Sequence, residues 1–228
     1  MKDLVARYRI LAIIAAAVVS ACSSNNSSTS ATPGQTNTLS FFVTSATNPT
    51  GNLGGLRAAD ALCQNLATAV GAGSKTWRAY LSVEHDADNG NSATNARARI
   101  GAGPWVNAAG VTVAANVNDL HARRGDASVF VDERGQRING QWTGSPAPVQ
   151  HDILTGSAAD GSLMPGFTCT DWTSSSSSIA AQVGHADGFG PNQDTSGSLS
   201  SWNSAHASAS CADTAPRGGA GRIYCFAR

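Results

Sequence analysis

The hydrophobic positions of this chain recur with two different periods, and these periods predict the elements of its fold. Residues 56–70 (LRAADALCQNLATAV) carry apolar side chains at spacings of three and four, which predicts an amphipathic helix. Cys63 falls on the buried face of that helix, and Gly71 and Gly73 are expected to end it. This is the one strong helical pattern in the sequence.

Several shorter segments predict strands. Residues 39–45 (LSFFVTS) are rich in aromatic and β-branched side chains, and residues 76–83 (TWRAYLSV) alternate apolar and polar positions as a half-buried strand does. Further strands are expected in the second half of the chain, at residues 151–155, 167–172 and 222–227. One main helix, many short strands and long Gly- and Ser-rich loops together predict an α+β fold.

The N-terminal residues predict a targeting segment. Basic residues are followed by the apolar run 10–19, which is too short to cross a bilayer but typical of a secretory signal. Ser20 and Ala21 then precede Cys22, and this pattern resembles the signal of bacterial lipoproteins. The resemblance implies that residues 1–21 are removed and that Cys22 is acylated, for example with palmitate, which would anchor the protein in a membrane. An ordinary signal peptide with an unrelated cysteine is the alternative.

The segment that begins at Cys22 predicts a linker. Residues 22–38 are rich in Ser, Asn and Thr and nearly free of apolar side chains, so we expect a flexible tether. Ser23 follows Cys22 where an Asp would favour retention in the inner membrane, and this favours the outer membrane of a bacterial envelope. Residues 39–228 are then expected to form one folded domain.

Four cysteines remain within that domain: Cys63, Cys169, Cys211 and Cys225. An even number of cysteines in an exported chain predicts two disulfides, although sequence alone leaves three pairings open. A zinc site built from the four thiolates is the alternative. The paired C-x2–4-C spacing that such sites usually have is absent, so we favour the disulfides.

Composition narrows the possible partners. Only 13% of the 228 residues are charged and the formal net charge is zero, which gives no electrostatic basis for binding nucleic acid. The short motifs of the common hydrolases and nucleotide-binding enzymes are also absent. We therefore do not predict an enzyme. A hydrolase whose histidines and carboxylates come together only in the folded chain is the less favoured alternative.

The order of the segments and cysteines resembles the C-type-lectin-like fold, and most closely its endostatin-like branch in bacterial exported proteins. The resemblance covers residues 39–228, and its main blocks are GNLGGLRAADALCQ (51–64), TWRAYLS (76–82), TCTDWTSS (168–175), SWNSAHASASC (201–211) and RIYCFAR (222–228). It implies the pairings Cys63–Cys225 and Cys169–Cys211. It also implies a binding module for carbohydrate or another macromolecule rather than an enzyme.

Sugar-binding members of that fold hold Ca²⁺ with a Trp-Asn-Asp strand motif and an acid-Pro-Asn loop motif. This chain has Trp202 and Asn203 followed by Ser204 in place of Asp, and its Pro191-Asn192 lacks the preceding acid. Both changes remove carboxylate ligands. The calcium site of the family is therefore not carried over, and any Ca²⁺ is expected to bind weakly.

The candidates for ligand contact lie in the second half of the chain. They are Trp202, Asn203, Asp187, His185, Asp160 and Asn192. Trp142 and Trp202 are the tryptophans expected at the surface, where an indole can stack on a sugar. At least three of the five tryptophans are expected to be buried.

Histidines and aspartates in the same region have a second interpretation. His151-Asp152 and His185-Ala186-Asp187 could supply metal ligands. Asp-Gly pairs at 160–161 and 187–188 are also typical of turns, and this is the interpretation we favour. For the hydrolase alternative, His151, His185 or His206 would need an Asp and a Ser within hydrogen-bond reach.

These observations predict a lipid-anchored, extracytoplasmic binding module of the bacterial cell envelope whose ligand is a glycan or another envelope or host macromolecule. A structural or adhesion lipoprotein that binds a protein partner is the alternative from a different functional class.

Overall fold

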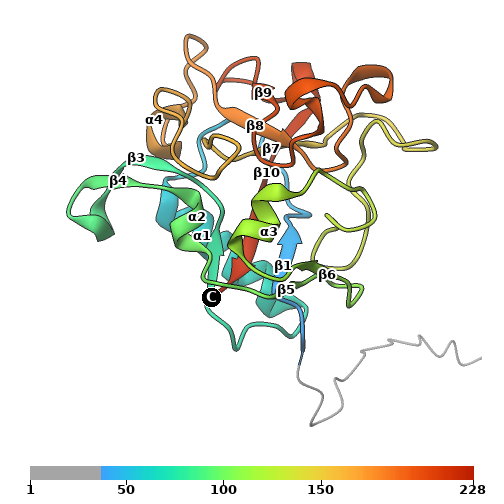
Figure 1. The fold of residues 1–228 in the computed structure, drawn as a ribbon. Coiled ribbons are helices and arrows are strands. Elements are labelled where there is room, and N and C mark those ends of the chain that lie inside the picture. Colours follow the sequence, from blue (N-terminus) through green and yellow to red (C-terminus); the bar gives the residue numbers. More distant parts are fainter. Residues whose placement is uncertain (1–36) are drawn as a thin grey trace, which may run out of the picture. The chain divides into compact units, whose positions relative to one another are not determined.

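The structure is a computed structural model that describes residues 37–228 (Figure 1). The predicted signal peptide, Cys22 and the predicted tether up to residue 36 lie outside the described residues. Within residues 37–228, no helix has the length and apolar character needed to cross a bilayer.

The last strand, β10 (Gly219–Ala227), lies at the centre of a six-stranded sheet. Its C-terminal half pairs antiparallel with β1 (Phe41–Val43) on one edge and with β2 (Trp77–Ala79) on the other. Cys225 has a partner residue in both strands, and the first and last strands of the domain therefore pair directly with each other. This accounts for the predicted strands at 39–45 and 222–227.

The N-terminal half of β10 carries a second set of strands. It pairs in parallel with β7 (Asp152–Leu154), which pairs antiparallel with β8 (Gln182–His185). The edge strand β9 (His206–Ala207) completes the sheet. Figure 1 shows β7, β8 and β9 gathered at one end of the domain.

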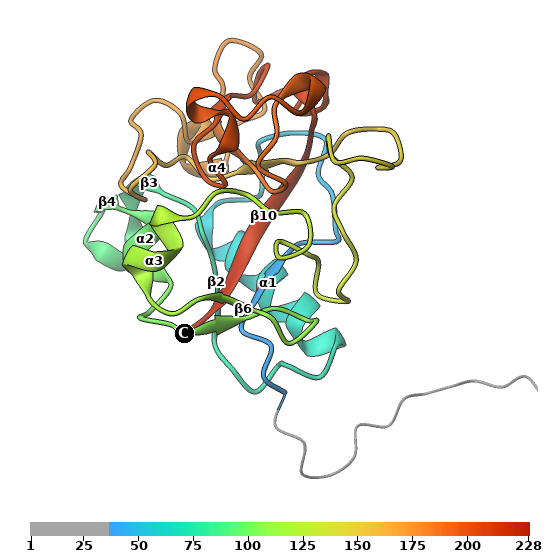
Figure 2. The same ribbon diagram turned by 45° about the vertical axis from the view of Figure 1, so that its right-hand side comes forward.

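The predicted main helix is confirmed as α1 (Leu56–Ala69). Its buried residues Ala59, Cys63 and Ala67 are four apart and form one face, which packs against the sheet beside β2 and β10 (Figure 2). Gly71 follows with φ +78°, a left-handed conformation that glycine adopts without steric cost.

The remaining elements are short. Strands β3 (Val83–Asp86) and β4 (Ser92–Thr94) form one hairpin, and β5 (Trp105–Val106) and β6 (Thr112–Ala114) form another. The remaining helical segments are α2 (Ala96–Arg99), α3 (Val117–Ala122), α4 (Cys169–Trp172), η1 (Ala87–Asn89), η2 (Pro191–Gln193), η3 (Gly197–Ser200) and η4 (Ala215–Arg217). The expected α+β class, with one main helix and short sheets, is confirmed.

Alternating side chains of β10 divide the core into two layers. Ile223 and Cys225 face a cluster that includes α1, Trp77 and Trp172. Tyr224 and Phe226 face the opposite way, into an aromatic cluster. The other large members of that second cluster are Phe41, Tyr80, Trp105, Phe130 and Trp202.

Two disulfides lie in the first of these layers, the one that contains α1. Cys63–Cys225 joins α1 to β10, and Cys169–Cys211 joins α4 to the loop before η4. Both pairings that the resemblance implied are confirmed. The four cysteines of the domain are therefore not available as thiolate ligands for zinc.

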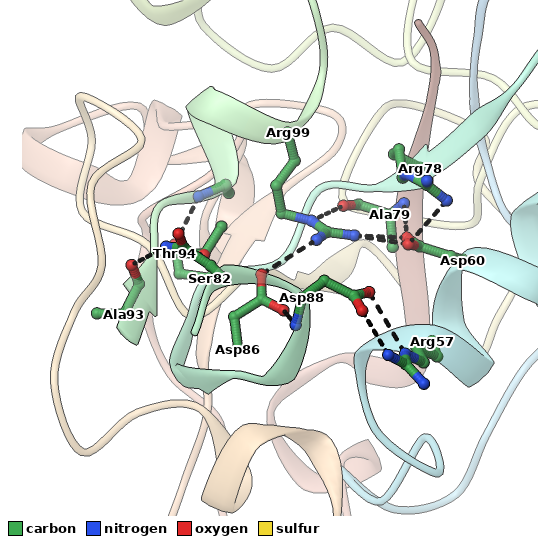
Figure 3. Close-up of polar contacts among 12 residues, drawn as sticks. Arg57, Asp60, Arg78, Ala79, Ser82, Asp86, Asp88, Ala93, Thr94 and Arg99 are labelled. Atoms are coloured by element: carbon green, nitrogen blue, oxygen red, sulfur yellow. Dashed lines mark hydrogen bonds and ion pairs between the residues drawn. The ribbon is translucent and has the colours of Figure 1, made fainter. Parts of the chain in front are cut away.

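A group of charged residues holds α1 against the hairpins. Figure 3 shows Arg99 reaching toward Asp60, its closest oxygen 2.6 Å away, while Asp60 also accepts the backbone N–H of Ala79 at 2.8 Å. Asp86 lies on the other side of the Arg99 guanidinium at 4.0 Å. These side chains are largely buried where α1, β2, β3 and α2 meet, and their hydrogen bonds and ion pairs connect those elements.

The expected strand at residues 167–172 is wrong. Residues 169–172 instead form the short left-handed turn α4, with φ between +51° and +65°. The Cys169–Cys211 bridge and the buried indole of Trp172, which donates to the carbonyl of Ser82 at 2.9 Å, hold the turn from both ends. The Asp171 carboxylate accepts the backbone N–H groups of Glu84 and His85. Tertiary contacts here override the β propensity of the sequence.

The strand expected at residues 76–83 is divided. Strand β2 ends at Ala79, and β3 begins at Val83. The alternation predicted a half-buried strand, yet Tyr80 and Ser82 are buried as well, because the aromatic cluster covers the second face. Four tryptophans are buried, as expected, but Trp202 is one of them, so its expected exposure is wrong. Trp142 is half-buried.

Candidate functional site

Three strands bring histidines and an aspartate together at the end of the sheet. In the register of β7 and β8, Asp152 lies directly opposite His185, so both side chains leave the same face. His206 on β9 is paired with Val183, two residues before His185, and therefore lies diagonally across the same face. His151 precedes β7, and its ring stacks on that of His185 at 4.4 Å between centroids. We call His151, Asp152, His185 and His206 the histidine cluster.

The Nε2 atoms of the three rings face the carboxylate of Asp152. His151 Nε2 and His185 Nε2 lie 3.4 and 3.3 Å from Asp152 Oδ1. His206 Nε2 lies 3.7 Å from Asp152 Oδ2 and 2.9 Å from His185 Nε2. Nitrogens of His151 and His185 and the Asp152 carboxylate therefore lie within 4.8 Å of one another, and His206 lies beside this group, next to His185.

The Nδ1 atoms of the same rings point outward to fixed acceptors. His151 Nδ1 lies 2.7 Å from Asp187 Oδ1, and His185 Nδ1 lies 2.7 Å from the carbonyl oxygen of Leu199. His206 Nδ1 lies 2.9 Å from the carbonyl oxygen of Ala207. These contacts orient each ring so that its Nε2 faces Asp152.

Burial makes the negative charge of Asp152 costly, because its carboxylate is removed from water. The side chain of Asp152 is 1% exposed, and neither of its oxygens has a partner with hydrogen-bond geometry among the described residues. The side chains of His151 and His185 are also buried, whereas that of His206 is 28% exposed. A buried carboxylate without hydrogen bonds is rare because its desolvation is costly.

A cavity of about 430 Å³ gives access to the cluster. His151, His185 and His206 are among the residues that line it. The remaining lining residues are the apolar Val149, Pro191, Leu199 and Pro216, with Gln141, Arg217 and Gly218. Arg217 is exposed and donates to the carbonyl of Ala207 at 3.0 Å, so its guanidinium is held beside β9.

Two pKa shifts follow from this arrangement. Burial alone would lower the pKa of His185, but the close contact with Asp152 and its negative charge outweigh burial and raise that pKa above 6.5. Burial alone would raise the pKa of Asp187, but the contact with His151 and the backbone N–H groups of Gln141 and Phe189 hold it below 3.8. Asp187 is therefore an anionic acceptor for His151.

The predicted ligand-binding residues divide between two regions. His185 belongs to the histidine cluster, and Asp187 orients His151 within it. Trp202 and Asn203 are buried in the core instead, where the Asn203 amide donates to Tyr80 Oη and to the carbonyls of residues 158 and 159. The equivalent of the calcium motif is thus occupied by contacts within the protein.

Asp160 and Asn192 are exposed and lie in loops. Asp160 accepts the backbone N–H and hydroxyl of Ser162, so the turn interpretation is confirmed at this position. Asn192 belongs to η2 and has a left-handed φ of +57°. Asp187 also accepts the N–H of Phe189 across a turn, in addition to its contact with His151. The turn interpretation is thus confirmed at Asp187 as well.

The sequence identifies all four residues of the histidine cluster as candidates, but it does not show that they lie together. His151-Asp152 and His185 were candidates as adjacent pairs, and His206 only as part of a hypothetical catalytic site. The missing information is the pairing of β7, β8 and β9, which connects residues up to 55 positions apart. The one available signal is the pair His151-Asp152 at the start of a short segment with strand propensity; His206 lies between two alanines and has no such signal.

Comparison with known proteins adds no relatives. A scan of the chain against models of protein families finds no match, and a search among curated proteins finds none either.

Proposed function

We propose that this chain is an exported binding module that holds a small polar ligand, such as the terminal sugar of an envelope or host glycan, in the cavity beside the histidine cluster. One observation carries the proposal: a cavity of about 430 Å³ is lined by several apolar side chains and by three histidines. Small-molecule sites in proteins have this size and composition.

Two further observations support a binding role outside the cytoplasm. Disulfides persist in oxidising compartments, and this domain contains two. The N-terminal pattern that ends at Cys22 resembles a lipoprotein signal, which supports a lipid anchor and an outer-membrane location. The resemblance to C-type-lectin-like proteins supports a carbohydrate as the ligand class, with an endogenous protein partner as the alternative.

The cavity is a better location for the ligand than the segment that resembles the calcium motif. Asn203 is buried, its Oδ1 accepts from the hydroxyl of Ser201 at 3.1 Å, and its amide hydrogens are donated to three other acceptors. Ser204 accepts from the amide of Gln182 at 3.1 Å. Neither side chain is free to coordinate Ca²⁺ with a sugar. We therefore propose glycan binding that does not depend on Ca²⁺ at that segment.

Binding is favoured over hydrolysis by the contacts of the three histidines. Among residues 37–228, no serine hydroxyl is hydrogen-bonded to His151, His185 or His206. A serine hydrolase requires a nucleophile in such a contact with its histidine base. The cluster supplies histidines and a carboxylate but not this third group.

A glycan array tests the proposal. The full-length chain is applied to an array of bacterial and host glycans, and affinity for the best glycan is then measured by calorimetry. Val149→Trp places an indole in the cavity and is expected to lower that affinity at least about 10-fold, the factor that corresponds to about 1.4 kcal/mol. Val111→Trp makes the same change on the exposed surface and should leave affinity unchanged. Absence of glycan binding, or equal affinity of the Val149→Trp variant, would contradict the proposal.

A further inference from the structure

We infer that the histidine cluster is a binding site for a divalent transition-metal ion, with Zn²⁺ the ion that fits it best. The ligands would be Nε2 of His151, His185 and His206 together with the carboxylate of Asp152. This inference goes beyond ligand binding in the cavity, because it concerns what the protein binds before any glycan is present.

The hydrogen bonds of the three rings determine which nitrogen carries the proton. A carbonyl oxygen can only accept, so Nδ1 of His185 and Nδ1 of His206 must be the protonated nitrogens. Both oxygens of the Asp187 carboxylate also accept backbone N–H groups, so this group acts as an acceptor and requires the same of His151. In each neutral ring the Nε2 atom therefore carries a lone pair, and that lone pair faces Asp152.

Five acceptor atoms consequently face one another, with no donor for them among residues 37–228. They are the three Nε2 atoms and the two oxygens of Asp152. His185 Nε2 and His206 Nε2 are only 2.9 Å apart, and two lone pairs at that distance repel. Within the described part of the chain, both oxygens of Asp152 lack a hydrogen-bond partner while nearly fully buried. Such an array is stable only around a cation, which is either a metal ion or additional protons on the rings.

The two distances from Asp152 Oδ1 to the histidines fit a metal ion better than a hydrogen bond. Zinc bonds to nitrogen and oxygen of about 2.0–2.1 Å in a tetrahedron place neighbouring ligand atoms about 3.3–3.4 Å apart. The separations of Asp152 Oδ1 from His151 Nε2 and His185 Nε2 are 3.4 and 3.3 Å. A hydrogen bond from a protonated ring to a carboxylate would be about 2.7–2.9 Å instead. Ligand atoms of His151, Asp152 and His185 all lie within 4.8 Å of one another.

His206 would be the fourth ligand, supplied from the cavity side. It lies on the edge strand β9 and is the one partly exposed member of the cluster. Its contacts of 2.9 Å to His185 Nε2 and 3.7 Å to Asp152 Oδ2 differ from a tetrahedral edge by less than half an ångström. The ring of His206 would have to turn toward the other three ligands, and the cavity provides the path by which an ion enters.

The chemical types of the four ligands indicate which metal ions the site would prefer. Three neutral imidazoles and one carboxylate suit zinc and neighbouring first-row ions, whereas Ca²⁺ prefers six or more oxygens. The outward contacts of the Nδ1 atoms to Asp187, Leu199 and Ala207 are the kind of hydrogen bonds that orient metal-bound histidines. The site is thus different in ligands and position from the calcium motif of lectins.

Zinc titration of the metal-free full-length chain tests the inference. Equilibrium dialysis with Zn²⁺ alone, followed by elemental analysis, should give one ion per chain. His185→Gln and Asp152→Asn should each lower the affinity for Zn²⁺ by at least about 100-fold, and Asp187→Asn by about 10- to 100-fold. The control His85→Gln removes an exposed histidine outside the cluster and should keep wild-type affinity. X-ray absorption of the wild-type zinc complex should show three imidazoles and no sulfur, and it needs no variant.

Three results would overturn the inference. The first is less than one bound Zn²⁺ per wild-type chain, which would mean that protons on the histidine rings, and not a metal ion, stabilise the cluster. The second is equal loss of affinity in His85→Gln and His185→Gln, and the third is sulfur in the coordination sphere, both of which would place the ion elsewhere. Glycan binding is not measured in these experiments, so their failure is separate from failure of the proposed function.

Discussion

The carboxylate of Asp187 accepts a 2.7 Å hydrogen bond from Nδ1 of His151, although the two residues are 36 positions apart. Its second oxygen accepts the backbone N–H of Gln141 at 2.6 Å, and its first also accepts that of Phe189 at 3.2 Å. Three donors from three segments therefore meet at one buried carboxylate. This carboxylate therefore holds the ring of His151 and the backbone of Gln141 and Phe189 in place.

Asp187→Asn is expected to destabilise the fold by about 1–3 kcal/mol. An amide has one acceptor oxygen, so it cannot accept from Gln141 on one side and from His151 on the other, and its N–H₂ would face a donor. The free energy of unfolding in urea measures the effect. Asp194→Asn makes the same change on an exposed loop and should alter stability by less than about 0.5 kcal/mol. Equal stability of the two variants would contradict this account of Asp187.

Gly140 leaves the space in which the Asp187 carboxylate lies. A Cβ at this position would come within 2.9 Å of Asp187 Cγ and 3.3 Å of His151 Cβ. Gly140→Ala is therefore expected to displace the carboxylate and cost about 1–3 kcal/mol of stability. The imidazole proton resonances of His151 should shift in the NMR spectrum of the variant. Wild-type stability together with unshifted resonances would show that the neighbouring loop can move aside freely.

The two disulfides are expected to contribute unequally. Cys63 and Cys225 are 162 residues apart, whereas Cys169 and Cys211 are 42 apart. Loop closure in the unfolded chain then gives about 5 kcal/mol for the first bridge and about 4 kcal/mol for the second. Cys63→Ala/Cys225→Ala should therefore lose more stability than Cys169→Ala/Cys211→Ala in urea unfolding. Because both double variants remove the same atoms, the reverse order would mean that local packing, not chain entropy, dominates.

Local sequence patterns predicted the elements that depend on local interactions. The helix at 56–69 follows from its apolar spacing, and the strands around residues 41–43, 152–154 and 219–227 follow from β-branched and aromatic content. The left-handed turn at 169–172 could not be predicted in this way, because a disulfide and a buried indole impose it.

The histidine cluster could be predicted only in part, for a related physical reason. Asp152 and His185 face each other because of strand register, and register depends on the packing of the whole sheet. Sequence spacing does not encode that pairing when the strands are 28 or more residues apart and joined by long loops. Trp202 illustrates the same limit: its polar neighbours suggested the surface, yet its indole fills the aromatic cluster between Tyr80 and Phe130.

His121 provides a test of pH dependence away from the histidine cluster. Its Nδ1 donates to the carbonyl of Val117 at 2.7 Å, so its Nε2 accepts from Tyr80 Oη, also at 2.7 Å. Burial lowers the pKa of His121 below 6.5, and the positive charge of Arg97 acts in the same direction against the weaker effect of Asp160. The folded state therefore contains neutral His121 at neutral pH.

The sign of the effect follows from proton uptake. Below pH 6.5 the unfolded chain protonates His121 more readily than the folded chain does, so stability falls as pH drops from 6.5 through the lowered pKa. His121→Gln keeps an acceptor for Tyr80 but cannot protonate, and it should reduce the loss of stability between pH 7.5 and 5. The reduction should be about 1.4 kcal/mol for each unit by which folding lowers the pKa. Urea unfolding of both proteins at each pH measures it, and a loss as large in the variant as in the wild type would show that His121 does not titrate in this range.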